Sequence, residues 1–280
     1  MASVPLITAR EIPAARAAAQ KVVRTHERLA AWLRPGMTLA QIDTFVAKTL
    51  DELACRSCFL NYRVKDHPRF PSHACLSLND CIVHGTAGYY LSPMKLGDVL
   101  KIDIGVFFEG WVGDAAWTYV FGEPTPLVRR LTECGKKALA LGMEHLRAGV
   151  PHLRWSETVQ DCVERDYGFH CIRNWGGHSI GKNLLHGPPH LLNHRPAMPG
   201  EAAAASEKWR AGTLMAVEPM IGIGTGETYM RPSSVRGLME WPVFTADRSL
   251  SVHYEHDVLI TESGPEVLTQ GLEQVRDVIV

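Results

Sequence analysis

Two aspartates in neighbouring stretches of the sequence have the types and the spacing to bind a divalent cation. Asp103 and Asp114 each stand inside an apolar run, and the two runs are joined by Glu109-Gly110. That dipeptide is typical of a two-residue hairpin turn, and such a turn would pair Gly105 with Asp114. Because side chains alternate along a strand, the two aspartates would be diagonal neighbours on one face, about 7–8 Å apart at Cα.

Two carboxylates that face each other in an apolar sheet repel, and at least one should bind a proton unless a cation compensates. A divalent metal supplies that compensation, because carboxylate oxygens are suitable ligands for hard cations. The alternative is that one aspartate faces solvent and the other caps the next turn, since charged strand residues commonly face water. The hairpin alone leaves both interpretations open.

Three further donors occur where an acid or an imidazole is not expected. Glu218 interrupts an apolar run just before a proline, and Glu255 lies in a second apolar run. His178 has glycines on both sides, which would let it approach a ligand closely. Singly, each is more often structural, but four carboxylates and one imidazole form the ligand set for two divalent ions that share bridging oxygens. This set is Asp103, Asp114, His178, Glu218 and Glu255.

The elements that must position these donors indicate an α+β fold. Helices grouped separately from hairpins are typical of helices that back an antiparallel sheet. A long surface loop is predicted from Pro188 to Ala205, because prolines precede a run of alanines there. Hydrophobic periodicity predicts helices over 8–33, 38–53, 127–146 and 156–167, and strands near 75–83, 99–108, 111–121, 215–223 and 251–261.

A weak internal repeat indicates a duplicated helix–helix–strand unit. The glycine turn that precedes Asp103 recurs before Glu218, and Arg34-Pro35-Gly36 recurs at a nearly equal spacing as Arg147-Ala148-Gly149. A chain of 280 residues and 31.0 kDa lies near the upper limit for one domain. We therefore expect a single domain over 1–280, with internal halves of roughly 1–125 and 126–280.

Composition excludes several classes of protein. The 29 basic and 30 acidic residues give a net charge of −1, so no charge excess favours a nucleic-acid groove or a membrane surface. No apolar run approaches the roughly 18 residues of a membrane span, and the N-terminal stretch lacks the apolar core of a secretory signal. An odd number of cysteines, 7, argues against a complete disulfide framework and fits a reducing cytoplasm. We expect a cytoplasmic protein without a membrane or specific nucleic-acid partner.

Five groups of residues, in order from about residue 8 to 270, closely resemble the type I methionine aminopeptidases of the pita-bread metallopeptidase family. Each group alone is weak, whereas the ordered set is specific. The groups are Ser77-Leu78-Asn79-Asp80 with His84-Gly85, Ile102-Asp103 with Gly113-Asp114, Gly177-His178-Ser179-Ile180-Gly181, Val217-Glu218-Pro219-Met220, and Asp247-Arg248-Ser249-Leu250-Ser251 with Tyr254-Glu255-His256.

The resemblance implies a pita-bread fold and a dinuclear centre of Co, Mn, Fe or Zn held by the five donors above, with Asp114 and Glu255 bridging both ions. A metal-bound water would attack the carbonyl that follows an N-terminal methionine, and Glu218 would act as general base and acid. His186 would contact the substrate carbonyl or the oxyanion, and His84 the scissile nitrogen. The substrates would be methionyl peptides and nascent chains with a small second residue, bound by a monomer in transient contact with the ribosome.

In the same family the methionine pocket has an aromatic and sulfur lining. Without the resemblance, such aromatic side chains would be interpreted as core residues. The residues at the matching places are Phe59, Tyr62, Phe70, Cys75 and Trp241, and Leu185 is a further candidate for substrate binding that stands where the family usually has an aromatic residue.

The sequence departs from the family pattern beside this pocket. His178 and His186 are one residue further apart than usual, so His190 is a reserve candidate for the second histidine. The segment Arg63–Arg69 is several residues longer than typical. These departures keep two alternatives open, namely a specialised pita-bread aminopeptidase with an altered side-chain preference and a non-catalytic pita-bread binding protein. Prolidase and aminopeptidase P relatives match less well, because they usually carry an extra N-terminal domain.

Overall fold

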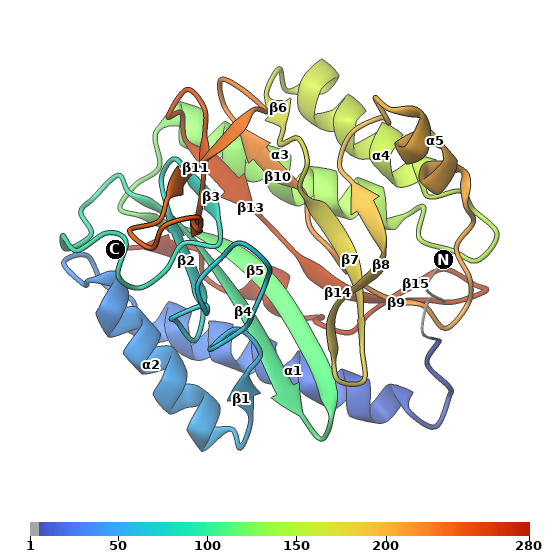
Figure 1. Cartoon of the computed structure of the whole chain (residues 1–280), viewed down its shortest axis with the longest axis horizontal. Helices are drawn as coiled ribbons and strands as arrows, with labels where there is room; N and C mark the ends of the chain where they lie inside the picture. The colour runs from blue at the N-terminus through green and yellow to red at the C-terminus, as the bar shows by residue number, and fades with distance from the viewer. Residues whose placement is uncertain (1–5) are drawn as a thin grey trace.

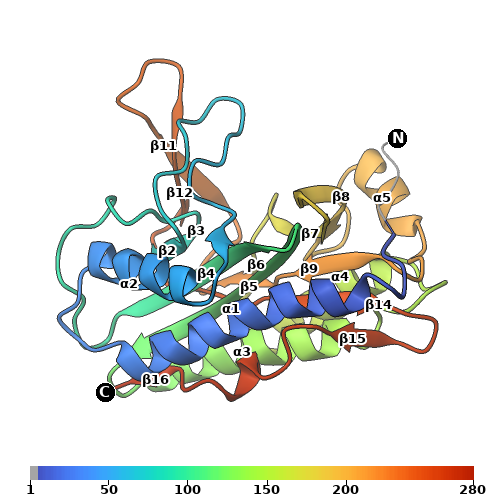
Figure 2. The ribbon, with the colours of Figure 1, turned by 90° about the horizontal axis from the view of Figure 1, so that it is seen from below.

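Two long helices, α1 (Ile12–Trp32) and α3 (Pro126–Met143), lie behind the strands in Figure 1 and beneath them in Figure 2. This computed structural model describes residues 6–280. Every helix in that range is too short or too polar to cross a bilayer. The shorter helical elements are α2 (Leu39–Glu52), α4 (Leu153–Gln160), its π-helical continuation η1 (Asp161–Asp166), α5 (Pro199–Ser206) and the 3₁₀ turn η2 (Leu272–Gln274).

The strands within residues 6–280 form four sheets, whose strand orders are β1-β4-β5-β16 with β2 on β4, β13-β10-β6, β11-β12-β3 and β15-β14-β9-β7-β8. Their bounds are β1 (Arg56–Ser57), β2 (Cys75–Leu78), β3 (Cys81–Val83), β4 (Val99–Phe108), β5 (Trp111–Phe121), β6 (His170–Cys171), β7 (Gly176–Gly181), β8 (Leu184–Leu192), β9 (Leu214–Val217), β10 (Met220–Gly222), β11 (Thr228–Pro232), β12 (Met239–Thr245), β13 (Ser251–His253), β14 (His256–Ile260), β15 (Pro265–Val267) and β16 (Val278–Ile279).

The hairpin of β4 and β5 has the register that the sequence predicts. Gly105 lies opposite Asp114, and Asp103 lies opposite Ala116. The turn residues of Glu109-Gly110 have φ angles of 50° and 81°, as a two-residue type I′ turn requires. The predicted hairpin is therefore confirmed, and it sets the two aspartates diagonally on one face.

Small residues in this hairpin allow neighbouring groups to approach closely. A Cβ on Gly113 would lie 2.6 Å from the carbonyl carbon of Ala18, so α1 packs directly against β5 at this point. A Cβ on Gly105 would lie 2.5 Å from the ring of Phe59. The space beside Gly105 is thus occupied by an aromatic ring.

Helix α1 begins later than the sequence predicts. The sequence predicts a helix from residue 8, but the helix begins at Ile12, with Glu11 as its N-cap residue. The carboxylate of Glu11 accepts a hydrogen bond from the backbone N–H of Thr8 at 3.0 Å, which holds together the residues just before the helix. No side chain among the described residues caps the first turn of the helix itself. Ala18 and Val22 are buried on the face toward the sheet, as the helical spacing predicts.

The predicted surface loop 188–205 is wrong, because it contains the end of β8 and all of α5 except its last residue. Alanine is the best helix former, and Pro199 occupies the first turn, where proline is tolerated. Glu201 accepts from the backbone N–H groups of Ala197 and Met198 at 2.8 and 3.0 Å. Pro188-Pro189 fits into β8 because β8 is an edge strand of its sheet. The division into two internal halves stays a prediction.

Candidate metal centre and peptide pocket

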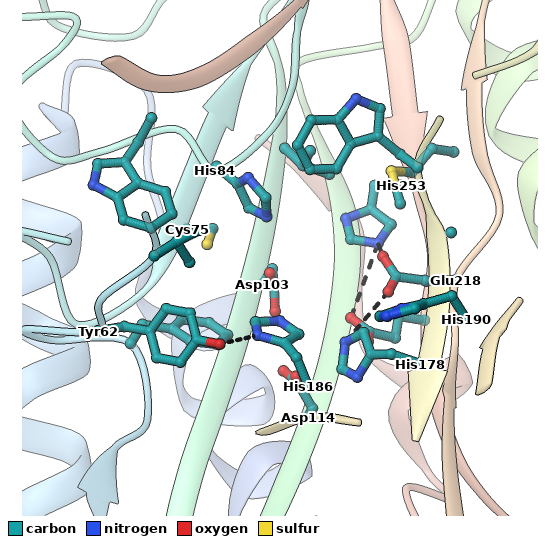
Figure 3. A pocket seen from close by; sticks show the side chains of 18 of the residues that line it. Tyr62, Cys75, His84, Asp103, Asp114, His178, His186, His190, Glu218 and His253 are labelled. Atoms are coloured by element: carbon teal, nitrogen blue, oxygen red, sulfur yellow. Dashed lines mark hydrogen bonds and ion pairs between the residues drawn. The ribbon is translucent and has the colours of Figure 1, made fainter. Parts of the chain in front are cut away.

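Asp103 and Asp114 lie on the face of the β4–β5 hairpin that borders a cavity of about 540 Å³ (Figure 3). Asp114 is buried, and its backbone N–H donates to Oδ2 of Asp257 at 2.8 Å. Burial and neighbouring negative charge raise the pKa of Asp103 to about 8 and hold the pKa of Asp114 well above its usual value. The paired aspartates therefore have an electrostatic cost that a cation would remove.

Glu218 and Glu255 occupy matched interruptions in two neighbouring strands. The predicted strand 215–223 is divided into β9 and β10 at Glu218-Pro219, and the predicted strand 251–261 is divided into β13 and β14 at Tyr254-Glu255. Because β9 pairs with β14 and β10 with β13, the two gaps lie opposite each other. The N–H of Glu255 donates instead to the carbonyl oxygen of Ala116 in β5, at 2.9 Å. The paired gaps thus place both glutamates at the junction of three sheets.

His178 is presented by β7, between β8 and β9. Its Nδ1 lies 3.3 Å from the carbonyl oxygen of Ser179, so an Nδ1–H can donate there and leave the Nε2 lone pair for a ligand. Nε2 lies 3.5 Å from Oε1 of Glu218. A Cβ on Gly177 would lie 2.5 Å from the carbonyl oxygen of Ala216 in β9, so only glycine allows β7 to bring the imidazole this close to the carboxylates.

The donor atoms are close enough together to hold divalent cations. Two overlapping groups have ligand atoms within 4.8 Å of one another; the groups are Asp114, His178 and Glu255, and Glu218, His253 and Glu255. Asp103 belongs to neither group but lines the same cavity. Within residues 6–280, Oδ1 of Asp103 and Oδ1 of Asp114 are buried and have no hydrogen-bond partner. Orphaned carboxylate oxygens beside an imidazole fit a divalent metal.

Burial also sets the protonation of the surrounding groups. It holds the pKa values of Glu218 and Glu255 well above their usual range, with nearby aspartate charge adding to each shift. It holds the pKa of His178 well below its usual value and lowers the pKa of His84 to about 3. The metal-free centre therefore contains neutral imidazoles and carboxyl groups that resist ionisation.

His253 is a member of the second donor group that the sequence interpretation did not single out. It lies at the end of β13, is buried, and places Nε2 3.2 Å from Oε2 of Glu218. A signal for it was present, because Ser251, His253 and Glu255 alternate along one predicted strand and share a face.

The two histidines expected to contact the substrate, His84 and His186, both line the cavity. His84 has a left-handed backbone with φ of 57°, and its ring packs edge-on against the rings of Trp175 and Trp241. The ring of His186 lies 4.4 Å from that of His178, measured between centroids. The hydroxyl of Tyr62 lies 2.6 Å from Nδ1 of His186, so Tyr62 reaches across the cavity to this ring (Figure 3).

The five residues expected to hold methionine line the cavity, together with the reserve histidine His190; the five are Phe59, Tyr62, Phe70, Cys75 and Trp241. Leu185 does not line it. Side chains alternate along β8, so Leu185 points away from the face that carries His186 and packs in an apolar cluster with Ile180.

The longer segment Arg63–Arg69 forms part of the pocket wall. Val64 and His67 line the cavity, and the ring of His67 lies 4.7 Å from that of Trp241. The indole N–H of Trp241 donates to the carbonyl oxygen of Pro68 at 2.9 Å. This segment projects beside the loop between β11 and β12 in Figure 2, where the N–H of Met239 donates to the carbonyl oxygen of Asp66 at 2.9 Å.

Comparison with known proteins assigns the chain to a family. The profile of metallopeptidase family M24 matches residues 14–262. The chain belongs to metallopeptidase family M24. The methionine aminopeptidase of Aquifex aeolicus is 32% identical to this M24 member over 269 residues, covering 96% of this chain and 99% of that protein. Methionine aminopeptidase 1 of Mycobacterium tuberculosis is 32% identical over 277 residues, covering 96% of each. The predicted resemblance to methionine aminopeptidases is confirmed.

Solved structures confirm the predicted α+β pita-bread fold of this M24 member. The methionine aminopeptidase of Thermotoga maritima superposes with a TM-score of 0.83 at 28% identity, covering 95% of this chain and 99% of that one. Prolidase from Pyrococcus furiosus shares the fold with a TM-score of 0.69 at 17% identity, but this chain covers only 65% of it. Membership of a metallopeptidase family implies divalent metal cofactors, and the carboxylate–imidazole cluster supplies donors for them.

Proposed function

We propose that this M24 member removes the N-terminal methionine from peptides and nascent proteins. The observation that carries the proposal is the position of the carboxylate–imidazole cluster in the wall of a cavity that also contains aromatic rings and a thiol. The cluster provides a site for hydrolysis, while the apolar part of the wall provides contacts for a thioether side chain.

The cofactor is proposed to be two divalent ions, which Asp103, Asp114, His178, Glu218 and Glu255 would hold. Co²⁺, Mn²⁺, Fe²⁺ and Zn²⁺ all suit a site of oxygen donors with one imidazole. Such ions lower the pKa of a water molecule and polarise a carbonyl oxygen. Their charge also offsets the repulsion among the buried carboxylates.

The chain's own residues would position the substrate and move protons. Glu218 would accept a proton from the attacking water and deliver it to the departing amine. His186 would donate from Nε2 to the carbonyl oxygen as negative charge develops there, and the Tyr62 hydroxyl at 2.6 Å would hold its Nδ1. His84, whose ring packs edge-on against two indole rings, would contact the scissile nitrogen.

The remaining properties follow from this activity. The substrates would carry a small residue after methionine, and the enzyme would act as a cytoplasmic monomer that contacts the ribosome transiently during synthesis. Val64 and His67 add to the wall of the cavity, and this addition favours a preference for the first side chain of the substrate that differs from that of other methionine aminopeptidases. An enzyme with such a preference would be the specialised pita-bread aminopeptidase that the sequence indicates as an alternative.

The decisive experiment begins with metal analysis of protein purified without added metal. The protein is then depleted with a chelator, reconstituted with Mn²⁺ or Co²⁺, and assayed on Met-Ala-Ser and Met-Gly-Met-Met peptides. We expect release of methionine only after reconstitution. Release of other residues in preference to methionine would support the specialised enzyme, and no turnover with any metal would support a binding protein.

A further inference from the structure

We propose that His253 is a sixth ligand of the metal centre and gives one ion a second imidazole. The site would comprise Glu218, His253 and Glu255, whose donor atoms lie within 4.8 Å of one another. The inference rests on the metal centre proposed above and adds a ligand that the sequence-based ligand set does not contain.

The orientation of the His253 ring carries the argument. Its Nε2 lies 3.2 Å from Oε2 of Glu218 and 3.9 Å from Oε2 of Glu255, yet both ring nitrogens are buried without a hydrogen-bond partner within residues 6–280. The ring and the Glu218 carboxylate are therefore close without being aligned for a hydrogen bond. Metal–ligand bonds of about 2.1 Å place neighbouring ligand atoms about 3.0 to 3.4 Å apart at octahedral or tetrahedral angles. The contact between His253 and Glu218 matches that separation.

The contact between His178 and Glu218 provides an internal comparison. His178 is the imidazole expected to bind metal, and its Nε2 lies 3.5 Å from Oε1 of the same carboxylate. Glu218 thus has one imidazole nitrogen beside each of its two oxygens. His253 thus shares the closeness to Glu218 that recommends His178 as a ligand, although within residues 6–280 the Nδ1 of His253 has no partner like the Ser179 carbonyl oxygen beside that of His178.

The backbone of His253 is fixed on both sides, so the ring position is built into the fold. The hydroxyl of Thr118 in β5 donates to the carbonyl oxygen of His253 at 2.7 Å and accepts from its N–H at 3.1 Å. In the adjacent sheet, His253 pairs with Met220 in β10. The strand ends at this residue, beside the gap that carries Glu255.

A second imidazole changes which metals the centre prefers. Imidazole nitrogen suits Fe²⁺, Co²⁺ and Zn²⁺, whereas carboxylate oxygen suits Mn²⁺ and Mg²⁺. A site with two nitrogen donors therefore discriminates more strongly in favour of the first group than the expected site with one. The ion expected at this site is therefore a divalent transition metal of intermediate hardness, such as Fe²⁺, Co²⁺ or Zn²⁺.

The test compares His253→Gln with two matched imidazole-to-amide changes. His178→Gln removes the expected imidazole ligand, and His145→Gln removes a histidine outside the cavity lining and outside both donor groups. Dissociation constants for Co²⁺ and Mn²⁺ are measured by competition with a chromogenic chelator. We expect His253→Gln to weaken Co²⁺ binding about tenfold or more and Mn²⁺ binding by about threefold or less, with both constants unchanged in His145→Gln.

Proton NMR of the Co²⁺-loaded protein counts the ligating imidazoles directly. Each imidazole bound through Nε2 gives a strongly shifted, solvent-exchangeable Nδ1–H resonance. We expect two such resonances in the wild type, one in either single variant and none in the double variant. If His253→Gln does not fold, His253→Asn supplies the same comparison, and the count in the wild type stands without any variant.

Separate outcomes overturn this inference and the proposed function. One shifted resonance in the wild type, lost in His178→Gln and retained in His253→Gln, would mean that His253 is only part of the pocket wall. Equal weakening of Co²⁺ and Mn²⁺ in His253→Gln would likewise contradict nitrogen ligation. A protein that binds no Co²⁺ at all would instead remove the metal centre on which the proposed function depends.

Discussion

The hydroxyl of Tyr62 lies 2.6 Å from Nδ1 of His186, and this contact joins the wall of the pocket to the ring expected to meet the substrate carbonyl. When the phenol donates to Nδ1, the ring proton is held on Nε2, the nitrogen needed to donate to a developing oxyanion. The sequence predicts that Tyr62 contacts the methionine side chain, and the structure adds that its hydroxyl contacts the ring of His186.

Tyr62→Phe is therefore expected to lower kcat about tenfold with little change in KM, since the aromatic ring is kept and only the orientation of His186 is lost. Steady-state kinetics on Met-Ala-Ser would measure this. Tyr90→Phe, the same change outside the cavity lining, is the control. In a His186→Gln background the Tyr62 change should have no further effect. Additive losses would show that Tyr62 acts independently of His186.

Glu218→Gln and Asp103→Asn should separate proton transfer from metal binding. The first is expected to reduce turnover about 10³-fold while at least one ion stays bound, because an amide cannot accept the proton. The second should lower metal affinity and activity together, because Asp103 is proposed as a ligand. Metal content and kcat are measured on the same samples, with the exposed Glu262→Gln as control. Normal hydrolysis by both variants would contradict the site assignment.

Metal removal should destabilise the protein most at alkaline pH. The pKa of Asp103 is about 8 in the folded metal-free protein against an ordinary value of 3.8. A carboxyl pKa raised on folding contributes stability that is fully present below about pH 4 and is lost as the pH rises through 8. We expect the unfolding midpoint of metal-free protein to fall by about 5 °C or more between pH 6 and pH 9.

Saturating Mn²⁺ should raise the thermal unfolding midpoint more at about pH 8.5 than at about pH 6, because protons compete with the ion for the carboxylates at the lower pH. Differential scanning calorimetry with and without chelator measures both curves. Parallel curves across this range would mean that the carboxylates are not coupled to metal binding.

His67→Ala tests the role of the longer segment. His67 lies against Trp241 and lines the cavity, so removal of its ring enlarges the pocket near the proposed position of the methionine side chain. Relative to methionine, cleavage of a larger first residue such as phenylalanine should improve about tenfold in kcat/KM, a difference expected from one lost pocket contact. Arg63→Ala, on an exposed side chain of the same segment, is the control. An unchanged ratio would place the segment outside substrate selection.

The β4–β5 hairpin and its two aspartates could be predicted because a two-residue turn and strict alternation determine both register and face. The fold class followed from the order of helices and hairpins. The gaps at Glu218 and Glu255 could not be predicted from either strand alone, because each gap is matched to one on a neighbouring strand that is distant in sequence. Helix α5 was missed because prolines were given more weight than the alanines that follow them.

The proposed ligands lie between positions 103 and 255 and come from three sheets, and the strands on either side of Glu218 and Glu255 pair with strands that are distant in sequence. Loop closure over such separations is slow, so these sheets meet late as the chain collapses. Binding of a coloured ion such as Co²⁺ would consequently report the time at which the three sheets come together during folding. A chain refolding in its presence should acquire ligand-field absorption only after helical circular dichroism has recovered.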